Sequence, residues 1–231
     1  MSLFSEAKIV ESWQKNALPW AAAVRRGEIQ SRKLATDRAI VDAVLSRSPS
    51  SVLDIGCGEG WLARELAAET IRVTGVDIIP TLIERAQSAG GGQFFVASYE
   101  EIAAGRLAIS ADVIVCNFSL LGNESVEGVF RAVPRMLNRS GSFIIQTIHP
   151  VAACGNLPYQ DGWREGSWDG FSADFTDPAP WYFRTLETWK DLFSKNGLRL
   201  IETREPTHPI TQRPASAIFI GEEDVTSQRH R

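Results

Sequence analysis

The 231-residue sequence has few of the residues that build metal centres or disulfide frameworks. It contains three cysteines and three histidines, and no two cysteines form a C-x-x-C pair. Cys57, Cys116 and Cys154 lie far apart along the chain, in no zinc-finger spacing. The first residues, MSLFSEAKIVESW, carry acids and no apolar stretch typical of a secretory signal. We therefore expect free thiols, no metal site and a cytoplasmic location.

Long apolar runs and a positive net charge are also missing. No run reaches the ~18 apolar residues of a membrane-spanning helix. The net charge is −4 and the pI about 5.5, which argues against nucleic-acid binding, because phosphate contacts dominate that affinity. The 44% of hydrophobic residues suffices for a core, and the length suits one domain with a modest insert. Tryptophan is plentiful, with seven residues against three tyrosines.

Short apolar runs alternate with helix-like segments in the middle of the chain. The pattern predicts strands at 52–55, 71–76, 94–96, 112–116 and 142–148. It predicts helices at 61–69, 81–89, 100–104 and 126–137, the last kinked or split by Pro134. This order indicates an α/β fold with a doubly wound, mostly parallel sheet and right-handed crossovers.

The two ends of the chain depart from this alternation. A helix over 5–15, broken at Leu18-Pro19, and a second over 32–47 suggest an N-terminal helical arm at 1–47. At 151–184 an aromatic-rich insert interrupts the main domain, which spans 48–221. A helix over 185–196, with Thr185 as N-cap and Gly197 after its end, precedes strands at 198–203 and 217–221. We expect these strands to form an antiparallel hairpin, followed by a frayed polar tail at 222–231.

A glycine-rich loop follows the first predicted strand. Residues 52–60 read VLDIGCGEG, so Gly56, Gly58 and Gly60 lie between a strand and a helix, where main-chain N–H groups can meet an anionic ligand. Asp77 ends the next strand, where a carboxylate can accept both hydroxyls of a ribose. The third glycine comes one residue too early for a dinucleotide fingerprint, which counts against NAD. The alternatives are a tight turn for the glycines and a helix cap for Asp77.

Four segments together carry a family resemblance: VLDIGCGEG, GVDII (75–79), FFVASYEEI (94–102) and ADVIVCNFSLLG (111–122). In these segments the chain resembles class I S-adenosylmethionine-dependent methyltransferases. The later TIHP, WYFRTLETWKDLFSKNGL and EP (205–206) are similar to the small-molecule, ubiquinone/menaquinone-methyltransferase-like group. The resemblance implies a Rossmann-like, seven-stranded fold, S-adenosyl-L-methionine as cofactor and S-adenosyl-L-homocysteine as product.

On the family's pattern, the cofactor-contacting residues lie at the carboxyl ends of the first four strands. They are Asp54, Gly56 and Gly58 along the methionine part, Asp77 at the ribose, Ile78, Ser98 and Tyr99 at the adenine, and Asn117 and Phe118 beside the sulfonium. The family often has Asp at the position of Ser98, so here a hydroxyl or a main-chain group would replace it. Ser98, Tyr99 and Phe118 are equally compatible with structural roles.

The acceptor side is expected after the fifth strand. His149 is the candidate general base, because its pKa range suits proton transfer near neutral pH; the alternative is a cap on the strand end. Tyr182 is a candidate hydrogen-bond partner of the acceptor. Arg184 is a candidate partner for a substrate carboxylate or phenolate, or else forms an internal ion pair with Asp174 or Glu187.

Six of the seven tryptophans fall near these segments. Trp163, Trp168 and Trp181 lie in the insert, which would cover an aromatic or apolar acceptor or form a satellite core. Trp13 and Trp20 lie in the arm, either as a lid over the cofactor or packed on the sheet. Trp61 directly follows the glycine loop.

The leading functional hypothesis is methyl transfer to the oxygen, carbon or nitrogen of a small organic acceptor by in-line displacement. The alternatives are a non-catalytic S-adenosylmethionine-binding sensor or assembly protein and, less favoured, an NAD-dependent oxidoreductase. CNFS after the fourth strand differs from the NPPY-like run of methyltransferases that act on planar nitrogens. The acceptor, the methylated atom and the choice between monomer and homodimer stay open.

Overall fold

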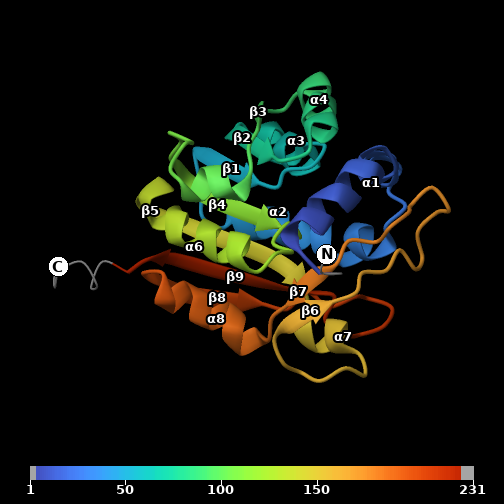
Figure 1. The fold of residues 1–231 in the computed structure, drawn as a ribbon. Helices are drawn as coiled ribbons and strands as arrows, with labels where there is room; N and C mark the ends of the chain where they lie inside the picture. The colour runs from blue at the N-terminus through green and yellow to red at the C-terminus, as the bar shows by residue number, and fades with distance from the viewer. Residues whose placement is uncertain (1–3, 225–231) are drawn as a thin grey trace.

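The computed structural model describes residues 4–224, built around a seven-stranded sheet (Figure 1). The strand order is β3-β2-β1-β4-β5-β9-β8. The strands are β1 (Ser51–Ile55), β2 (Arg72–Asp77), β3 (Gln93–Val96), β4 (Ala111–Asn117), β5 (Leu137–Ile148), β8 (Leu198–Arg204) and β9 (Ser216–Glu223). The first five are parallel, whereas β9 is antiparallel to both β5 and β8. The predicted doubly wound sheet with an antiparallel C-terminal hairpin is confirmed.

Helices cover both faces of the sheet (Figure 1). On one face lie α2 (Asp37–Leu45), α3 (Trp61–Ala68) and α4 (Pro80–Ala89); on the other lie α5 (Tyr99–Ala103), α6 (Glu124–Met136) and α8 (Leu186–Lys195). Ile40 and Val44 of α2 are fully buried in the same cluster as Val113 and Ile144 of the sheet. This helix, predicted as part of the arm, therefore packs as one of the layer helices. A π-helical turn, η1 (Arg32–Thr36), precedes it.

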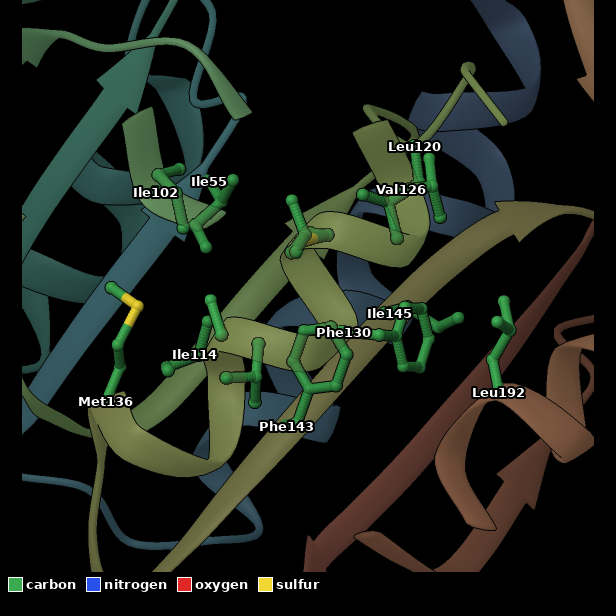
Figure 2. Close-up of a cluster of buried hydrophobic side chains, with 14 of the residues drawn as sticks. Ile55, Ile102, Ile114, Leu120, Val126, Phe130, Met136, Phe143, Ile145 and Leu192 are labelled. Atoms are coloured by element: carbon green, nitrogen blue, oxygen red, sulfur yellow. The ribbon is translucent and has the colours of Figure 1, made fainter. Parts of the chain in front are cut away.

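The core on the α6 and α8 face contains phenylalanine rings packed among aliphatic side chains, and Figure 2 shows Phe130 and Phe143 there. Phe130 of α6 lies edge-on to Phe143 of β5, with ring centroids 5.1 Å apart, and edge-on to Phe193 of α8 at 5.2 Å. All three rings are fully buried. Since burying such a side chain contributes about 1.5–3 kcal/mol, this cluster anchors α6 and α8 to the sheet.

Two prolines lie inside helices. The predicted break at Leu18-Pro19 is wrong, because α1 (Glu6–Arg26) continues through Pro19. Ala17 and Ala21, on either side of it, are both buried against Ile79 and Leu82, and this packing offsets the ~3 kcal/mol cost of an internal proline. Pro134 likewise lies within α6 without splitting it.

The insert contains short elements that its sequence pattern did not predict. They are α7 (Pro150–Cys154), β6 (Gly162–Arg164) and β7 (Trp181–Phe183), and the two strands pair antiparallel. Thr185 caps α8 as predicted, accepting from the N–H of Thr188. Of the tail predicted at 222–231, residues 225–231 lie outside the described part of the chain. No helix among residues 4–224 is long and apolar enough to cross a membrane.

Candidate active site

The glycine loop after β1 is held against the ends of two neighbouring strands. The N–H of Gly56 donates to Val76 O at 2.7 Å, and the N–H of Gly58 donates to Asp77 Oδ2 at 2.9 Å. Gly56 has φ 78°, and a Cβ there would collide with the side chain of Ser119, which follows β4. The position needs glycine both for its backbone conformation and for this close approach.

The carboxylate of Asp77 accepts two main-chain hydrogen bonds. One carboxylate oxygen holds the glycine loop, and Oδ1 accepts from the N–H of Ile79 at 2.9 Å, where the chain turns into α4. Burial raises the pKa of Asp77, and the main-chain hydrogen bonds oppose that rise. Each carboxylate oxygen can accept a further hydrogen bond, so a ribose contact stays compatible with this geometry.

Three buried acceptor oxygens lie on one face of the sheet at its carboxyl edge. Oδ1 of Asp54, Oδ1 of Asn117 and Oε1 of Gln146 have no hydrogen-bond partner among the described residues. They belong to β1, β4 and β5. In each strand, the residue two positions earlier packs on the α2 face of the sheet. Because side chains two positions apart on a strand point to the same side, all three oxygens face α2. Because burial and the negative charge of Asp77 disfavour its ionised form, the pKa of Asp54 rises to about 7.

A buried guanidinium belongs to the turn that contacts Gln146. Gln146 Nε2 donates to Thr36 O at 3.2 Å, which fixes η1 over this part of the sheet. In the same turn Arg32 is 8% exposed, and its Nη2 has no hydrogen-bond partner among the described residues. Its guanidinium lies over the ring of Trp61 at 4.6 Å, and its Nε donates to Asp37 at 2.9 Å.

Acceptor oxygens without partners on the sheet, and a guanidinium nitrogen without a partner on the turn that contacts Gln146, suit a group that carries both an ammonium and a carboxylate. The amino-acid end of S-adenosylmethionine is such a group, and the residues present therefore fit this cofactor. Arg32 and Gln146 were not among the residues predicted from the sequence. Gln146 had a visible signal, a polar residue within the apolar run FIIQTI, whereas Arg32 reads as an ordinary surface residue of a helix.

Three further cofactor candidates, Ser98, Tyr99 and Phe118, each make contacts with a structural role. Ser98 forms a capping box with Glu101 at the start of α5. The hydroxyl of Tyr99 donates to Ser119 O at 2.9 Å, and burial holds its pKa well above the usual value. Phe118 has φ 54°, a conformation costly for a bulky residue, and its N–H donates to Gln146 O at 2.8 Å. Such strain marks the segment after β4 as a candidate functional site.

Ile78, expected at the adenine, is half-buried where α1 meets the sheet edge. It packs against the buried cluster that includes Ile79, as do Trp13 and Trp20 of α1. The rings of Trp13 and Trp20 are 5.0 Å apart. Trp20 also approaches the glycine loop, since its Nε1 lies 3.9 Å from the position of a Cβ on Gly58. The arm therefore covers the glycine loop.

The arm and the insert meet through aromatic rings, here called the aromatic cover: Trp13, Trp20, Trp168, Phe171 and Phe175. Trp13 contacts Trp168 with ring centroids 5.9 Å apart, and Trp20 contacts Phe171 at 6.3 Å. In Figure 1 the orange insert loop runs beside blue α1. A groove of about 690 Å³ opens next to the cover, between η1, the end of α1 and the insert.

Arg184 is engaged inside the protein. It is 2% exposed, and its two terminal nitrogens donate to Gly122 O at 2.8 Å and Asn123 O at 3.0 Å. The predicted internal ion pair with Asp174 or Glu187 is wrong: the partners found are carbonyl oxygens at the start of α6. Burial lowers the pKa of Arg184. The guanidinium stacks on Tyr182 at 4.8 Å, so both acceptor-side candidates support the segment after β4.

His149 follows β5 and forms the N-cap of α7. The residue is 5% exposed, and neither ring nitrogen makes a hydrogen bond to the described residues. Its Nε2 lies 3.4 Å from Oε1 of Glu205. In residues 4–224 no group of three or more His, Cys, Asp or Glu side chains is arranged to hold a metal ion.

Comparisons with known proteins agree with this geometry. A family model described as a methyltransferase domain matches residues 27–203. A ubiquinone biosynthesis O-methyltransferase of Xanthomonas oryzae is 30% identical over 118 residues, covering 49% of each chain. An uncharacterized methyltransferase of Schizosaccharomyces pombe is 30% identical over 123 residues, covering 50% of this chain and 44% of that protein. The chain thus matches about half the length of these curated relatives.

Solved structures share the fold. A plantazolicin methyltransferase, solved with a desmethyl-plantazolicin analogue and S-adenosylhomocysteine, gives a TM-score of 0.67 at 15% identity, covering 95% of this chain and 96% of that one. An S-adenosylmethionine-dependent methyltransferase of Mesorhizobium loti gives 0.61 at 21% identity, covering 79% and 96%. At these identities the likeness concerns the fold.

Proposed function

Because the chain belongs to the methyltransferase-domain family and has the class I fold of S-adenosylmethionine-dependent methyltransferases, we propose that it transfers a methyl group from S-adenosylmethionine to a small organic acceptor. This proposal rests on polar atoms without hydrogen-bond partners among the described residues: buried oxygens on β1, β4 and β5, and Nη2 of Arg32.

The cofactor would be held along the carboxyl edge of β1, β2 and β4. Arg32 would bind the carboxylate of the amino-acid end, and Asp54 and Asn117 its ammonium. Gly56 and Gly58 would line the methionine part, and Asp77 would accept the ribose hydroxyls. Ile78, Ser98 and Tyr99 would lie at the adenine, and Phe118 beside the sulfonium. Bound there, the cofactor supplies an electrophilic methyl group on a positively charged sulfur.

The acceptor would lie under the aromatic cover, with the groove as its way in. The groove is lined by both apolar and charged side chains, among them Ile29, Leu34, Phe171 and Phe175 beside Glu28 and Lys33. This lining suits an acceptor with an apolar body and polar groups. Holding donor and acceptor in line can supply up to roughly 7–11 kcal/mol of the barrier. His149 would take the acceptor's proton, which contributes about 10²–10⁴-fold.

Donor turnover distinguishes an enzyme from a non-catalytic binding protein. The purified protein would be incubated with S-adenosylmethionine and a metabolite panel, and formation of S-adenosylhomocysteine would be measured. We expect a slow basal rate that at least one acceptor stimulates. Tight binding of the cofactor without stimulation by any compound of the panel would favour the sensor or assembly protein.

A further inference from the structure

One buried polar group beyond the residues assigned to the cofactor is the imidazole of His149. Both ring nitrogens lack a hydrogen bond to the described residues. Leaving such groups unpaired costs about 1–3 kcal/mol, so a native protein that keeps one calls for an explanation. The carboxylate of Glu205 lies beside the imidazole, with Oε1 3.4 Å from Nε2.

The sheet topology explains why these two residues meet. β9 is antiparallel to both β5 and β8, so β5 and β8 run in the same direction and end at the same edge. His149 is the first residue after β5, and Glu205 is the first after β8. The N–H of Ala215 donates to Pro206 O at 2.7 Å, which holds the segment after Glu205 against the start of β9.

The carboxylate of Glu205 is not engaged with the arginine beside it. Arg204 pairs with Glu202 instead, with Nε 2.7 Å from Oε1 and Nη2 3.1 Å from Oε2. Glu205 has a half-exposed side chain, 49%, whereas His149 is buried. The carboxylate therefore stays in contact with water while it reaches Nε2 from the solvent side. Catalytic hydrogen bonds are often long before the substrate binds.

We propose that Glu205 is a positioning residue for His149. Its carboxylate accepts the Nε2–H, fixes the tautomer protonated at Nε2, and leaves the Nδ1 lone pair free as proton acceptor. The hydrogen bond made by one ring nitrogen sets the state of the other, as in other carboxylate–histidine pairs. The role rests on the proposed methyl transfer.

The proton and electrons balance in this arrangement. Nδ1 takes the proton that the acceptor's O–H, N–H or C–H group loses. The electron pair of that acceptor atom forms the new bond to the methyl carbon. The electron pair of the broken carbon–sulfur bond stays on sulfur, which becomes a neutral thioether. His149 becomes an imidazolium, and its positive charge lies beside the negative charge of Glu205. The proton later leaves His149 to solvent.

The pair can be tested by NMR without any acceptor. Protein labelled with ¹⁵N-histidine would be studied above pH 8, where an ordinary imidazole with a pKa of about 6.5 is neutral. We expect one protected ring N–H signal on Nε2 of His149, assigned by its loss in His149→Asn. Glu205→Ala should remove the signal, and Glu205→Gln should keep it, because an amide oxygen also accepts. Glu202→Ala, which removes a carboxylate three residues away, should leave it unchanged.

Three results would overturn the pair: proton attachment at Nδ1, no protected ring signal in the wild type, or an unchanged signal in Glu205→Ala. Calorimetry with S-adenosylhomocysteine on the same samples separates this outcome from failure of the proposed function. If the wild-type protein binds no S-adenosylhomocysteine, the proposed methyl transfer is overturned. The ring N–H signal still shows in that case whether His149 and Glu205 form the hydrogen bond. With an acceptor in hand, Glu205→Ala should lower kcat about 10-fold or more and leave KM for the donor unchanged.

Discussion

Asp54 is a buried carboxyl group whose protonation links the candidate site to folding. Its pKa rises from 3.8 to about 7 in the folded protein, chiefly through burial. Between these values the folded state holds a proton that the unfolded state releases, so stability decreases as pH rises from about 4 to 7. Asp54→Asn removes this dependence. We therefore expect the free energy of unfolding of the wild type, relative to the variant, to decrease between pH 5 and 7 and to level off above.

Urea denaturation at several pH values measures this difference directly. The comparison with Asp54→Asn removes contributions that other groups share between the two proteins. Parallel stability curves for the two proteins would mean that Asp54 is ionised throughout, and its assignment as an unpaired, neutral group would fall.

At this scale the sequence predicted the positions of residues on strands and loops better than the partners of their side chains. Asp54, Gly56, Gly58 and Asp77 lie where the motif placed them, because strand–loop–helix spacing is encoded locally. Arg184 shows the limit: its charge suggested a salt bridge, but its partners are carbonyl oxygens 62 and 61 residues away in sequence. Which distant main-chain groups meet a side chain depends on the tertiary fold.

At the scale of the elements, a buried side-chain amide joins the arm to the insert. Asn16 is fully buried; its Nδ2 donates to Thr176 O at 2.7 Å, and its Oδ1 accepts from the N–H of Thr176 at 2.9 Å. Asn16→Ala leaves both main-chain groups without these partners, at about 1–3 kcal/mol locally. We expect faster hydrogen exchange in residues 168–178, with the sheet unaffected.

Lys15→Ala is the matched control for this prediction. Lys15 contacts the neighbouring Asp177 of the same segment at 2.7 Å, but both side chains are largely exposed, at 43% and 67%. Water and salt screen such surface pairs, so they add little stability and exchange should change little. Equal effects of the two substitutions would contradict the buried amide as the tie between arm and insert.

Element boundaries show what a local pattern can and cannot predict. The strands at 52–55 and 142–148 follow from apolar runs and were predicted to within a few residues, apart from the earlier start of β5. A proline also predicts a helix break from local sequence alone. Helix α1 nevertheless runs through Pro19, because Ala17 and Ala21 pack on α4 and on the residue that precedes it. β6 and β7 have three residues each, too few for a detectable period.

At the level of the whole molecule, the sheet order brings the ends of β1, β2, β4, β5 and β8 to one edge. The glycine loop, Asp77, the strained Phe118 and the His149–Glu205 pair all lie at that edge, and the aromatic cover closes over the glycine loop. The family resemblance predicted the sheet and this edge. The hydrogen bonds between Asn16 of α1 and Thr176 of the insert could not be predicted, because no local sequence pattern encodes a contact between such distant residues.

The central claim is that this edge binds S-adenosylmethionine rather than a dinucleotide. Calorimetric titration with S-adenosylhomocysteine, and with NAD under the same conditions, tests it most directly. We expect S-adenosylhomocysteine to bind with one molecule per chain and to change the tryptophan fluorescence, because Trp20 and Trp61 lie beside Arg32. NAD should give no binding heat. Binding of NAD without binding of S-adenosylhomocysteine would contradict the assignment.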